Sequence, residues 1–364
     1  MRFFVPLAAS VAALTSPAKE LGDSGLVLMP LTAAATTAAM QSGPLSESGF
    51  QAYLPQLRAQ AERAGVSRTT IERVFPTLTF SARAVELDRA QPGGSATGPS
   101  SANPPFAPYR ARHVTSALIS RGRDRYMANL PRLRDIGRRY GVDPSVLVAI
   151  WGKETSFGAV TGDFDLANAL ATLAYEGRRR QLFAEEFVAT LKMMDRGIPR
   201  STLRGSWAGA TGHPQFLPSV YLRLGVDGDG DGRSDIWNSH VDALASIANY
   251  LRNAGWKPDM AWGVPASVPA GFNRAAVAPR TRAPRCPRVF ERHSRWLSVG
   301  EWRRLGVMPM RSGLSDRDMA SLIEPDGPGA TAYLTTNNYR TILDYNCSNF
   351  YALSVLLLAD GIGG

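Results

Sequence analysis

The sequence contains few cysteines, and neither stands in a metal-binding pattern. Among 364 residues only Cys286 and Cys347 occur, far apart, with no CxxC pair and no Cys/His spacing of the kind that zinc sites use. The sequence therefore argues against a zinc protein. Two interpretations of the pair stay open: two free buried thiols in a reducing compartment, or one disulfide in an oxidising compartment.

Long apolar runs and lysine-rich arms are also missing. The apolar stretches at 3–14 and 26–31 are too short to span a bilayer. A net charge of +10 favours an anionic partner, but the arginines are scattered along the chain, with 178–180 as the densest run. A nucleic-acid binder needs a basic face clustered on one element. We therefore expect no nucleic-acid partner and interpret the charge as favouring an anionic matrix.

The first 43 residues resemble an export signal followed by a disordered segment. Arg2 precedes the short apolar stretch, and Ser16, Pro17 and Ala18 supply small residues where a signal peptidase cuts. No cysteine near the start offers a site for a lipid anchor. We expect export to the periplasm in soluble form with no stable membrane anchor; the alternative is a disordered alanine-rich tail.

The stretch 143–158 predicts a helix that carries a carboxylate toward the core. Asp143 is a suitable N-cap, proline is tolerated in the first turn, and Gly158 is a natural stop. Glu154 shares one face with Leu147 and Ile150, because helical residues three and four apart are neighbours. A buried carboxylate is either paired or has a raised pKa. The second state suits a general acid; the alternative is a core glutamate neutralised by an arginine.

The rest of the chain predicts a mainly α fold of the α+β class. With 44% hydrophobic and 20% charged residues, the composition is that of a globular protein with room for two or three subdomains. Apolar residues from 44 onward recur at helical spacing, whereas 260–334 is rich in Pro and Gly with short apolar runs and predicts a small β-rich insertion. We expect an α domain from 44–140 plus 335–364, a catalytic core at 141–259, and the β-rich domain at 260–334.

A glycine-rich loop follows at 205–212. Its four glycines and small neighbours allow the backbone to approach a ligand closely, and it lacks the Lys-Ser/Thr ending of a phosphate loop. It leads into 213–219, where side-chain donors stand beside aromatic residues. We interpret the two stretches together as a ligand-binding segment.

The acidic stretch 227–235 has the spacing of an EF-hand-type calcium loop. Carboxylates stand at positions 1, 3, 5 and 9 with glycine at position 6, but Asn238 replaces the usual glutamate at position 12. Asp242 is the next carboxylate and closes a lengthened loop, or the site is weak; the alternative is an acidic surface turn. The predicted ligands are five residues: Asp227, Asp229, Asp231, the Arg233 carbonyl and Asp242.

Six motifs in order resemble the lytic murein transglycosylase B family, from about residue 50 to 360. They are 140–144 (YGVDP), 150–155 (IWGKET), 205–210 (GSWAGA), 214–219 (PQFLPS), 248–251 (ANYL) and 345–346 (YN). The resemblance implies a lysozyme-like helical core with an EF-hand-like calcium loop, flanked by an α domain and a β domain. It also implies cleavage of peptidoglycan glycan strands between N-acetylmuramic acid and N-acetylglucosamine. In that reaction the muramic acid C6 hydroxyl attacks its own C1 and leaves a 1,6-anhydro ring.

The resemblance also assigns site residues. It implies that Glu154 is the one catalytic acid and base, that calcium is structural, and that no catalytic cofactor is needed. The positions that match the sugar groove are Ser206, Gln215, Tyr250, Tyr345, Asn346 and Tyr109. Thr211 and His213 depart from the family's usual residues, which bears on subsite preference. The chain also lacks the family's usual anchoring cysteine and a second peptidoglycan-binding module, and we expect a monomer.

The residues themselves agree with a one-carboxylate reaction. Glycosidases that use water need two carboxylates flanking the bond. Asp163, Asp165 and Glu176 are the nearby candidates, and their spacing compels none of them onto the same cleft wall as Glu154. An intramolecular hydroxyl attack needs one carboxylate. The alternatives are a lysozyme-type hydrolase and a non-catalytic, calcium-stabilised wall-binding protein.

The two cysteines gain a specific prediction from these assignments. Cys286 lies in the β-rich insertion, and Cys347 directly follows the proposed groove residue Asn346. We predict a disulfide that ties the insertion to the C-terminal helices and fixes one wall of the groove.

Overall fold

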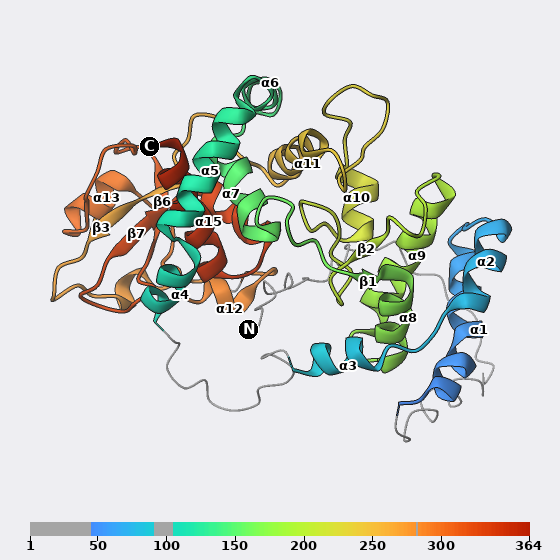
Figure 1. Cartoon of the computed structure of the whole chain (residues 1–364). Helices are drawn as coiled ribbons and strands as arrows, with labels where there is room; N and C mark the ends of the chain where they lie inside the picture. Colours follow the sequence, from blue (N-terminus) through green and yellow to red (C-terminus); the bar gives the residue numbers. More distant parts are fainter. Residues whose placement is uncertain (1–44, 91–104, 282) are drawn as a thin grey trace, which may run out of the picture.

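The computed structural model describes residues 45–90, 105–281 and 283–364 of the chain. These residues form a mainly helical molecule with three apolar clusters, two built from helices and one from a small sheet (Figure 1). The predicted export signal at 1–43 and most of the glycine- and proline-rich stretch at 91–105 lie outside the described residues.

The first helical cluster holds the predicted catalytic helix. α7 (Pro144–Thr155) packs against α5 (Ser116–Ala128), α6 (Leu130–Tyr140), α11 (His240–Asn253) and α15 (Asn349–Gly363). α4 (Phe106–His113) and α14 (Asn337–Tyr345) complete the group. Leu147 and Ile150 on α7 are fully buried, as the apolar spacing predicts.

The second helical cluster joins the N-terminal helices to the middle of the chain. α1 (Glu47–Arg63), α2 (Arg68–Val74) and α3 (Ala82–Arg89), with the 3-10 turn η1 (Phe75–Thr77), pack on α8 (Leu166–Glu176) and α9 (Arg180–Asp195). α10 (Pro218–Leu224) packs on α9. The apolar stripe on α1 is buried at all five positions: Phe50, Tyr53, Leu54, Leu57 and Ala61. The predicted domain boundaries stay a prediction. The helices α1–α3 belong to the second apolar cluster, whereas α4–α6 belong to the first.

The sheet lies within the predicted β-rich stretch, apart from the last residue of β7. Its strands are β3 (Gly263–Ser267), β4 (Leu297–Ser298), β5 (Met308–Pro309), β6 (Met319–Ile323) and β7 (Ala332–Thr335), in the antiparallel order β4-β6-β7-β3-β5. Short helical turns η2 (Ala275–Val277), α12 (Pro287–Phe290) and α13 (Val299–Arg304) connect them. Trp302 fills the core of this cluster and donates from Nε1 to the Ala320 carbonyl at 3.0 Å.

A disulfide joins the β-rich stretch to the C-terminal helices. Cys286, just before α12, bonds to Cys347 in the turn between α14 and α15, with their Cα atoms 5.7 Å apart. The predicted disulfide is confirmed. By restricting the unfolded chain, a cross-link that closes a loop of this length contributes about 4 kcal/mol in the chain-entropy picture.

Among the described helices, none is by itself long and apolar enough to cross a bilayer; α14 and α15 meet that criterion only as a pair, with a bend of 116° between them.

Candidate active site

Local sequence sets the start of α7, and tight packing sets its end. The Asp143 side chain accepts from Ser145 N at 2.8 Å, and Pro144 occupies the first turn, both as predicted. The helix ends at Thr155, three residues before the expected stop at Gly158. Ser156 and Phe157 both adopt positive φ angles, 51° and 62°, which non-glycine residues rarely do. The bend brings the Phe157 ring over Gly152, where an added Cβ would lie 2.6 Å from the ring.

Glu154 lies near the end of α7 with an unusual hydrogen-bond partner. The Tyr351 hydroxyl, from α15, donates to Glu154 Oε1 at 2.5 Å. Burial raises the pKa of Glu154 to about 7, while the Tyr351 hydrogen bond and the Lys153 ammonium act in the opposite direction. Near neutral pH this carboxyl group therefore populates both its protonated and its ionised form, as an acid that must also act as a base requires.

Tyr351 is a site residue that sequence reasoning missed. The sequence places it on the apolar stripe of the last helix, where a tyrosine passes for core, and the side chain is indeed 6% exposed. The signal that could have found it is the hydroxyl: a buried phenol on an apolar face usually has a hydrogen-bond partner. Its partner stands 197 residues earlier in the chain, and only the fold brings the two together.

A row of aromatic rings extends from Tyr351 across the boundary of the two helical clusters. The Tyr345 ring lies parallel to that of Tyr351 at 6.5 Å, Tyr250 meets Tyr345 edge-on at 4.8 Å, and Phe216 follows. Tyr250 and Tyr345 each pack against both clusters. Their hydroxyls donate to backbone carbonyls, Tyr250 to Asp344 at 2.7 Å and Tyr345 to Pro214 at 2.5 Å. The hydroxyls of Tyr250 and Tyr345 are therefore engaged within the protein.

Lys153 and Tyr109 form a second contact beside Glu154. The Lys153 Nζ atom donates to the Tyr109 hydroxyl at 3.2 Å and lies 4.8 Å from the centre of its ring. Burial lowers the pKa of Lys153 to about 8, with Glu154 opposing the shift. Tyr109 is thus close enough to Glu154 for the carboxylate to raise its pKa, although burial is the larger cause. Sequence reasoning named Tyr109 and missed Lys153.

The glycine-rich segment presents Ser206 and Gln215 from tight turns. Ser206 N donates to the Ala210 carbonyl at 2.7 Å, and Ala210 N donates back to Ser206 Oγ at 3.0 Å. Gln215 has φ of 52°, and its side-chain NH₂ donates to the carbonyls of Gly212 at 2.9 Å and Thr161 at 3.1 Å. The amide nitrogen of Gln215 is therefore engaged in holding the loop, and its amide oxygen is the atom left for a ligand.

Asn346 follows the tyrosine row directly. It is 6% exposed, and its backbone N–H ends α14 by donating to the Ile342 carbonyl at 3.0 Å. Its neighbour Cys347 carries the disulfide, so a covalent bond holds this turn in place.

Thr211 and His213 have partners inside the protein. Thr211 Oγ donates to the Arg204 carbonyl at 2.6 Å and accepts from Trp237 Nε1 at 2.7 Å. His213 Nδ1 accepts from Trp151 Nε1 at 3.1 Å, and the two rings stack. Both residues thus support the loop behind the site.

Glu186 binds the end of the 213–219 segment, and it is another residue that sequence reasoning missed. This side chain from α9 is 4% exposed and accepts from both Ser219 N at 2.9 Å and Ser219 Oγ at 2.6 Å. Burial raises its pKa, and the two donors of Ser219 oppose that shift. Glu186 therefore fixes the end of the segment that carries Gln215.

Two of the three carboxylates considered as partners for Glu154 are engaged elsewhere. Asp165 caps α8 through Asn168 N at 3.0 Å and forms an ion pair with Arg200 at 2.8 Å. Glu176 has a side chain 2% exposed and pairs with Arg89 at 3.1 Å. Among the described residues, no Asp or Glu shifts the pKa of Glu154; the one charge that does so is that of Lys153.

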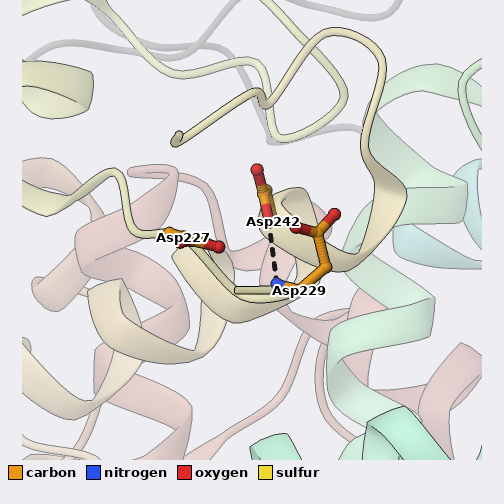
Figure 2. Close-up of side chains that lie close together, drawn as sticks. All are labelled: Asp227, Asp229 and Asp242. Carbon is orange, nitrogen blue, oxygen red and sulfur yellow. Dashed lines mark hydrogen bonds between the residues drawn. The ribbon is translucent and has the colours of Figure 1, made fainter. Parts of the chain in front are cut away.

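The acidic loop gathers three of its predicted ligands. Carboxylate oxygens of Asp227, Asp229 and Asp242 lie within 4.8 Å of one another, where the loop meets the first turn of α11 (Figure 2). Asp231 and Arg233 are exposed, and the Asp231 carboxylate lies outside this group. Oxygen donors of this kind, on a glycine-rich turn with φ of 86° at Gly230 and 88° at Gly232, fit a hard cation such as calcium.

Asp242, the next carboxylate after the loop, lies against the loop backbone. It is fully buried and accepts from the N–H groups of Gly228 at 2.8 Å, Asp229 at 3.2 Å and Asp235 at 2.6 Å (Figure 2 shows the second). Burial raises the pKa of Asp242, whereas the N–H groups of Gly230 and Gly232 hold the pKa of Asp227 below its usual value. The loop conformation is therefore built around its carboxylates.

Comparison with known proteins covers most of the chain. Residues 49–360 match the family described as Transglycosylase SLT domain. The chain is 32% identical over 279 residues to membrane-bound lytic murein transglycosylase B of Escherichia coli K12, covering 76% of this chain and 72% of that protein.

Solved structures agree. SltB3 of Pseudomonas aeruginosa in complex with NAG-anhNAM-pentapeptide is similar with a TM-score of 0.76 and 37% identity, over 86% of this chain and 80% of that one. Escherichia coli Slt35 in complex with calcium is similar with a TM-score of 0.69 and 27% identity, over 87% of this chain and 93% of that one. The sequence match and the fold together show that this chain belongs to the lytic murein transglycosylase family, with a lysozyme-like, mainly helical fold.

Proposed function

We propose that this protein cleaves the β-1,4 bond between N-acetylmuramic acid and N-acetylglucosamine in peptidoglycan, and that Glu154 acts as both acid and base. Family membership supports the reaction class, and the NAG-anhNAM-pentapeptide complex of SltB3 supports the substrate class. The observation that carries the mechanism is the environment of Glu154, with a pKa raised to about 7, a Tyr351 donor and no second carboxylate acting on it among the described residues.

In the first step the protonated Glu154 donates its proton to the glycosidic oxygen. The bond from that oxygen to C1 of the muramic acid breaks, and the N-acetylglucosamine part leaves with a free hydroxyl. The resulting carboxylate of Glu154 is stabilised by the Tyr351 hydroxyl and by the nearby Lys153 ammonium.

In the second step the Glu154 carboxylate takes the proton from the muramic acid C6 hydroxyl. That oxygen forms the new bond to C1 and closes the 1,6-anhydro ring, and Glu154 is protonated again without consuming water. Because attacking and attacked atoms belong to one sugar, the nucleophile is present at high effective concentration. The tyrosine row, Ser206, the Gln215 amide oxygen and Asn346 would hold the glycan across the boundary of the two helical clusters.

The mass of the products from purified peptidoglycan tests this proposal. Intramolecular attack leaves muramic acid ends lighter by one water than hydrolysis does. We expect anhydro ends only. Reducing ends alone would favour the lysozyme-type hydrolase, and Asp163, the candidate not engaged in an ion pair among the described residues, would then be the carboxylate to replace. Release of no fragments would favour the non-catalytic wall-binding protein.

We further infer that the acidic loop binds calcium in a structural role. Support comes from the donor group of Asp227, Asp229 and Asp242 and from the calcium complex of Slt35. Asp231 and the Arg233 carbonyl remain the additional ligands that the loop spacing predicts. The cation would balance carboxylates that otherwise repel one another, and would steady the start of α11, which carries Tyr250.

We also propose that the protein acts in the cell envelope, after export. Its substrate class lies outside the cytoplasm, and the Cys286–Cys347 disulfide suits an oxidising compartment.

A further inference from the structure

The positive charge of the chain is concentrated on three consecutive helices. α4, α5 and α6 contain nine arginines and two aspartates, with no lysine or glutamate, which accounts for +7 of the net charge of +10. All nine arginines are exposed, and we call them the basic face: Arg110, Arg112, Arg121, Arg123, Arg125, Arg132, Arg134, Arg138 and Arg139. The interpretation of the arginines as scattered along the chain is therefore wrong, because these nine lie within residues 110–139.

Packing explains why these arginines point to solvent. α5 turns Leu118, Ile119 and Tyr126 toward the first helical cluster, and at Gly122 an added Cβ would lie 2.5 Å from Ile362 of α15. α6 buries Leu133, Ile136 and Tyr140. The nine arginines are exposed on these helices, of which α5 packs on both α7 and α15 (Figure 1).

Most of this charge has no internal counterpart. Arg138 pairs with Asp135, but Arg121, Arg125, Arg132 and Arg134 form no ion pair within the part of the chain that the structure describes. Arg121 and Arg125 stand one helical turn apart, as do Arg134 and Arg138, and like charges at this spacing destabilise a helix. Arg123 supports the fold by donating to the carbonyls of Gly361 at 2.9 Å and Gly364 at 3.0 Å. The four arginines without an ion pair remain available to an anionic partner.

The position of the basic face and the residue types exposed on it indicate which anionic partner it binds. α4 also carries Tyr109, which contacts Lys153 beside Glu154, so the face adjoins the proposed glycan site. The face exposes one large apolar side chain, Met127, and no exposed aromatic residue, so it lacks the anchors of a membrane-inserting helix and the rings on which nucleic-acid bases stack. Guanidinium groups pair with carboxylates through two parallel hydrogen bonds.

We propose that the basic face binds the carboxylates of peptidoglycan stem peptides next to the glycan strand held at Glu154. The inference rests on the proposed function and adds to it a part of the substrate that the glycan groove does not contact. Binding holds the enzyme on the polymer between cleavage events, and it should weaken as salt rises, because exposed charges are screened within about 10 Å at 0.1 M ionic strength.

Co-sedimentation of the full chain with purified peptidoglycan sacculi tests the proposal. The variant R121Q/R125Q/R132Q/R134Q removes four unpaired charges, and R63Q/R280Q/R304Q/R317Q removes four exposed charges elsewhere as a matched control. At low salt we expect the first variant to bind about tenfold more weakly than wild type and the control to bind within about twofold. Equal binding by the two variants would overturn the proposal.

Peptide-free glycan strands separate this inference from the proposed function. Wild type and the four-arginine variant should bind these strands equally and should release products from them at equal rates. A defect of the variant on peptide-free strands would overturn the stem-peptide assignment. Stronger dependence of binding on the four arginines with duplex DNA or anionic phospholipid vesicles than with sacculi would also overturn it. Absence of anhydro products from wild type would instead contradict the proposed reaction, whatever the sedimentation result.

Discussion

The site helix and the acidic loop use carboxylates in opposite ways. Within the described residues Glu154 accepts one hydrogen bond, from a neutral phenol, and burial raises its pKa to about 7. Asp227 accepts backbone N–H groups at 2.6 and 2.8 Å on an exposed turn, and its pKa is lowered. A carboxyl group that must exchange a proton needs few donors and little water, whereas one that must stay anionic for a cation needs several fixed donors.

The largest expected effect is on catalysis. Glu154→Gln keeps the shape of the side chain but cannot donate and then recover a proton, so the rate of product release should fall by about 10²–10⁴-fold. Binding to sacculi should be unchanged, since the tyrosine row and the basic face are intact. Chromatography of released fragments measures the rate. A fully active variant would refute the assignment of Glu154.

The loop should respond to calcium where the site helix does not. At a calcium concentration of about 100 times its dissociation constant, binding to the folded state adds about 2.7 kcal/mol to the stability of wild type. Asp242→Asn should remove most of the resulting rise in Tm, because Asp242 is the buried member of the group.

Two further variants test whether the calcium-dependent rise in Tm is specific to the loop. Asp259→Asn removes an exposed carboxylate outside the loop, at a backbone φ of 58° that asparagine tolerates, and should leave the calcium response intact. Asp231→Asn should give an intermediate loss if the position-5 ligand takes part. Equal calcium responses in wild type and Asp242→Asn would show that the loop is not the binding site.

The raised pKa of Glu154 also predicts a pH-dependent cost in stability. The folded protein holds this proton up to about pH 7, while the unfolded chain releases it near the ordinary pKa of 4.5. Between these values the folded state binds more protons, so the free energy of unfolding falls as pH rises through this window.

Replacing the carboxyl group should abolish that cost. At pH 8 we expect the free energy of unfolding of Glu154→Gln to exceed that of wild type by roughly 1–3 kcal/mol, so that the variant melts at a higher temperature. Near pH 4 the two proteins should be equally stable. The Asp227 carboxylate, with its lowered pKa, works in the other direction and loses its contribution only as pH falls through the acid range. Identical melting of the two proteins at pH 8 would contradict burial as the cause of the Glu154 shift.

The smallest expected effect is that of removing the Tyr351 hydroxyl while keeping the Glu154 carboxyl group. Tyr351→Phe removes the hydroxyl that lowers the pKa of Glu154, so the pKa should rise and the alkaline limb of the pH–rate profile should move to higher pH. Activity near neutral pH should fall by about tenfold, since one charge-assisted hydrogen bond to the ionised intermediate is lost. Tyr339→Phe, at a buried tyrosine bonded to Asn349 instead, serves as the control. A pH profile unchanged in Tyr351→Phe would show that the contact plays no part in the proton transfer.

The local features of this protein could be predicted from its sequence. Asp143 and Pro144 begin α7 because capping and proline geometry act within a few residues. The spacing of the acidic loop is likewise local, and the stripe on α1 follows from helical periodicity. The order of six short motifs was enough to indicate the family, which the comparisons with known proteins show.

Contacts between residues far apart in the sequence could be seen only in the tertiary structure. The Tyr351–Glu154 hydrogen bond joins residues 197 apart, and the Lys153–Tyr109 contact joins two helices whose own patterns do not reveal each other. The exposure of the arginines on α4, α5 and α6 likewise depends on the fold, because these helices turn their apolar side chains toward the first helical cluster. Local propensity cannot encode such meetings: they depend on how buried faces pack, and packing is a property of the whole core.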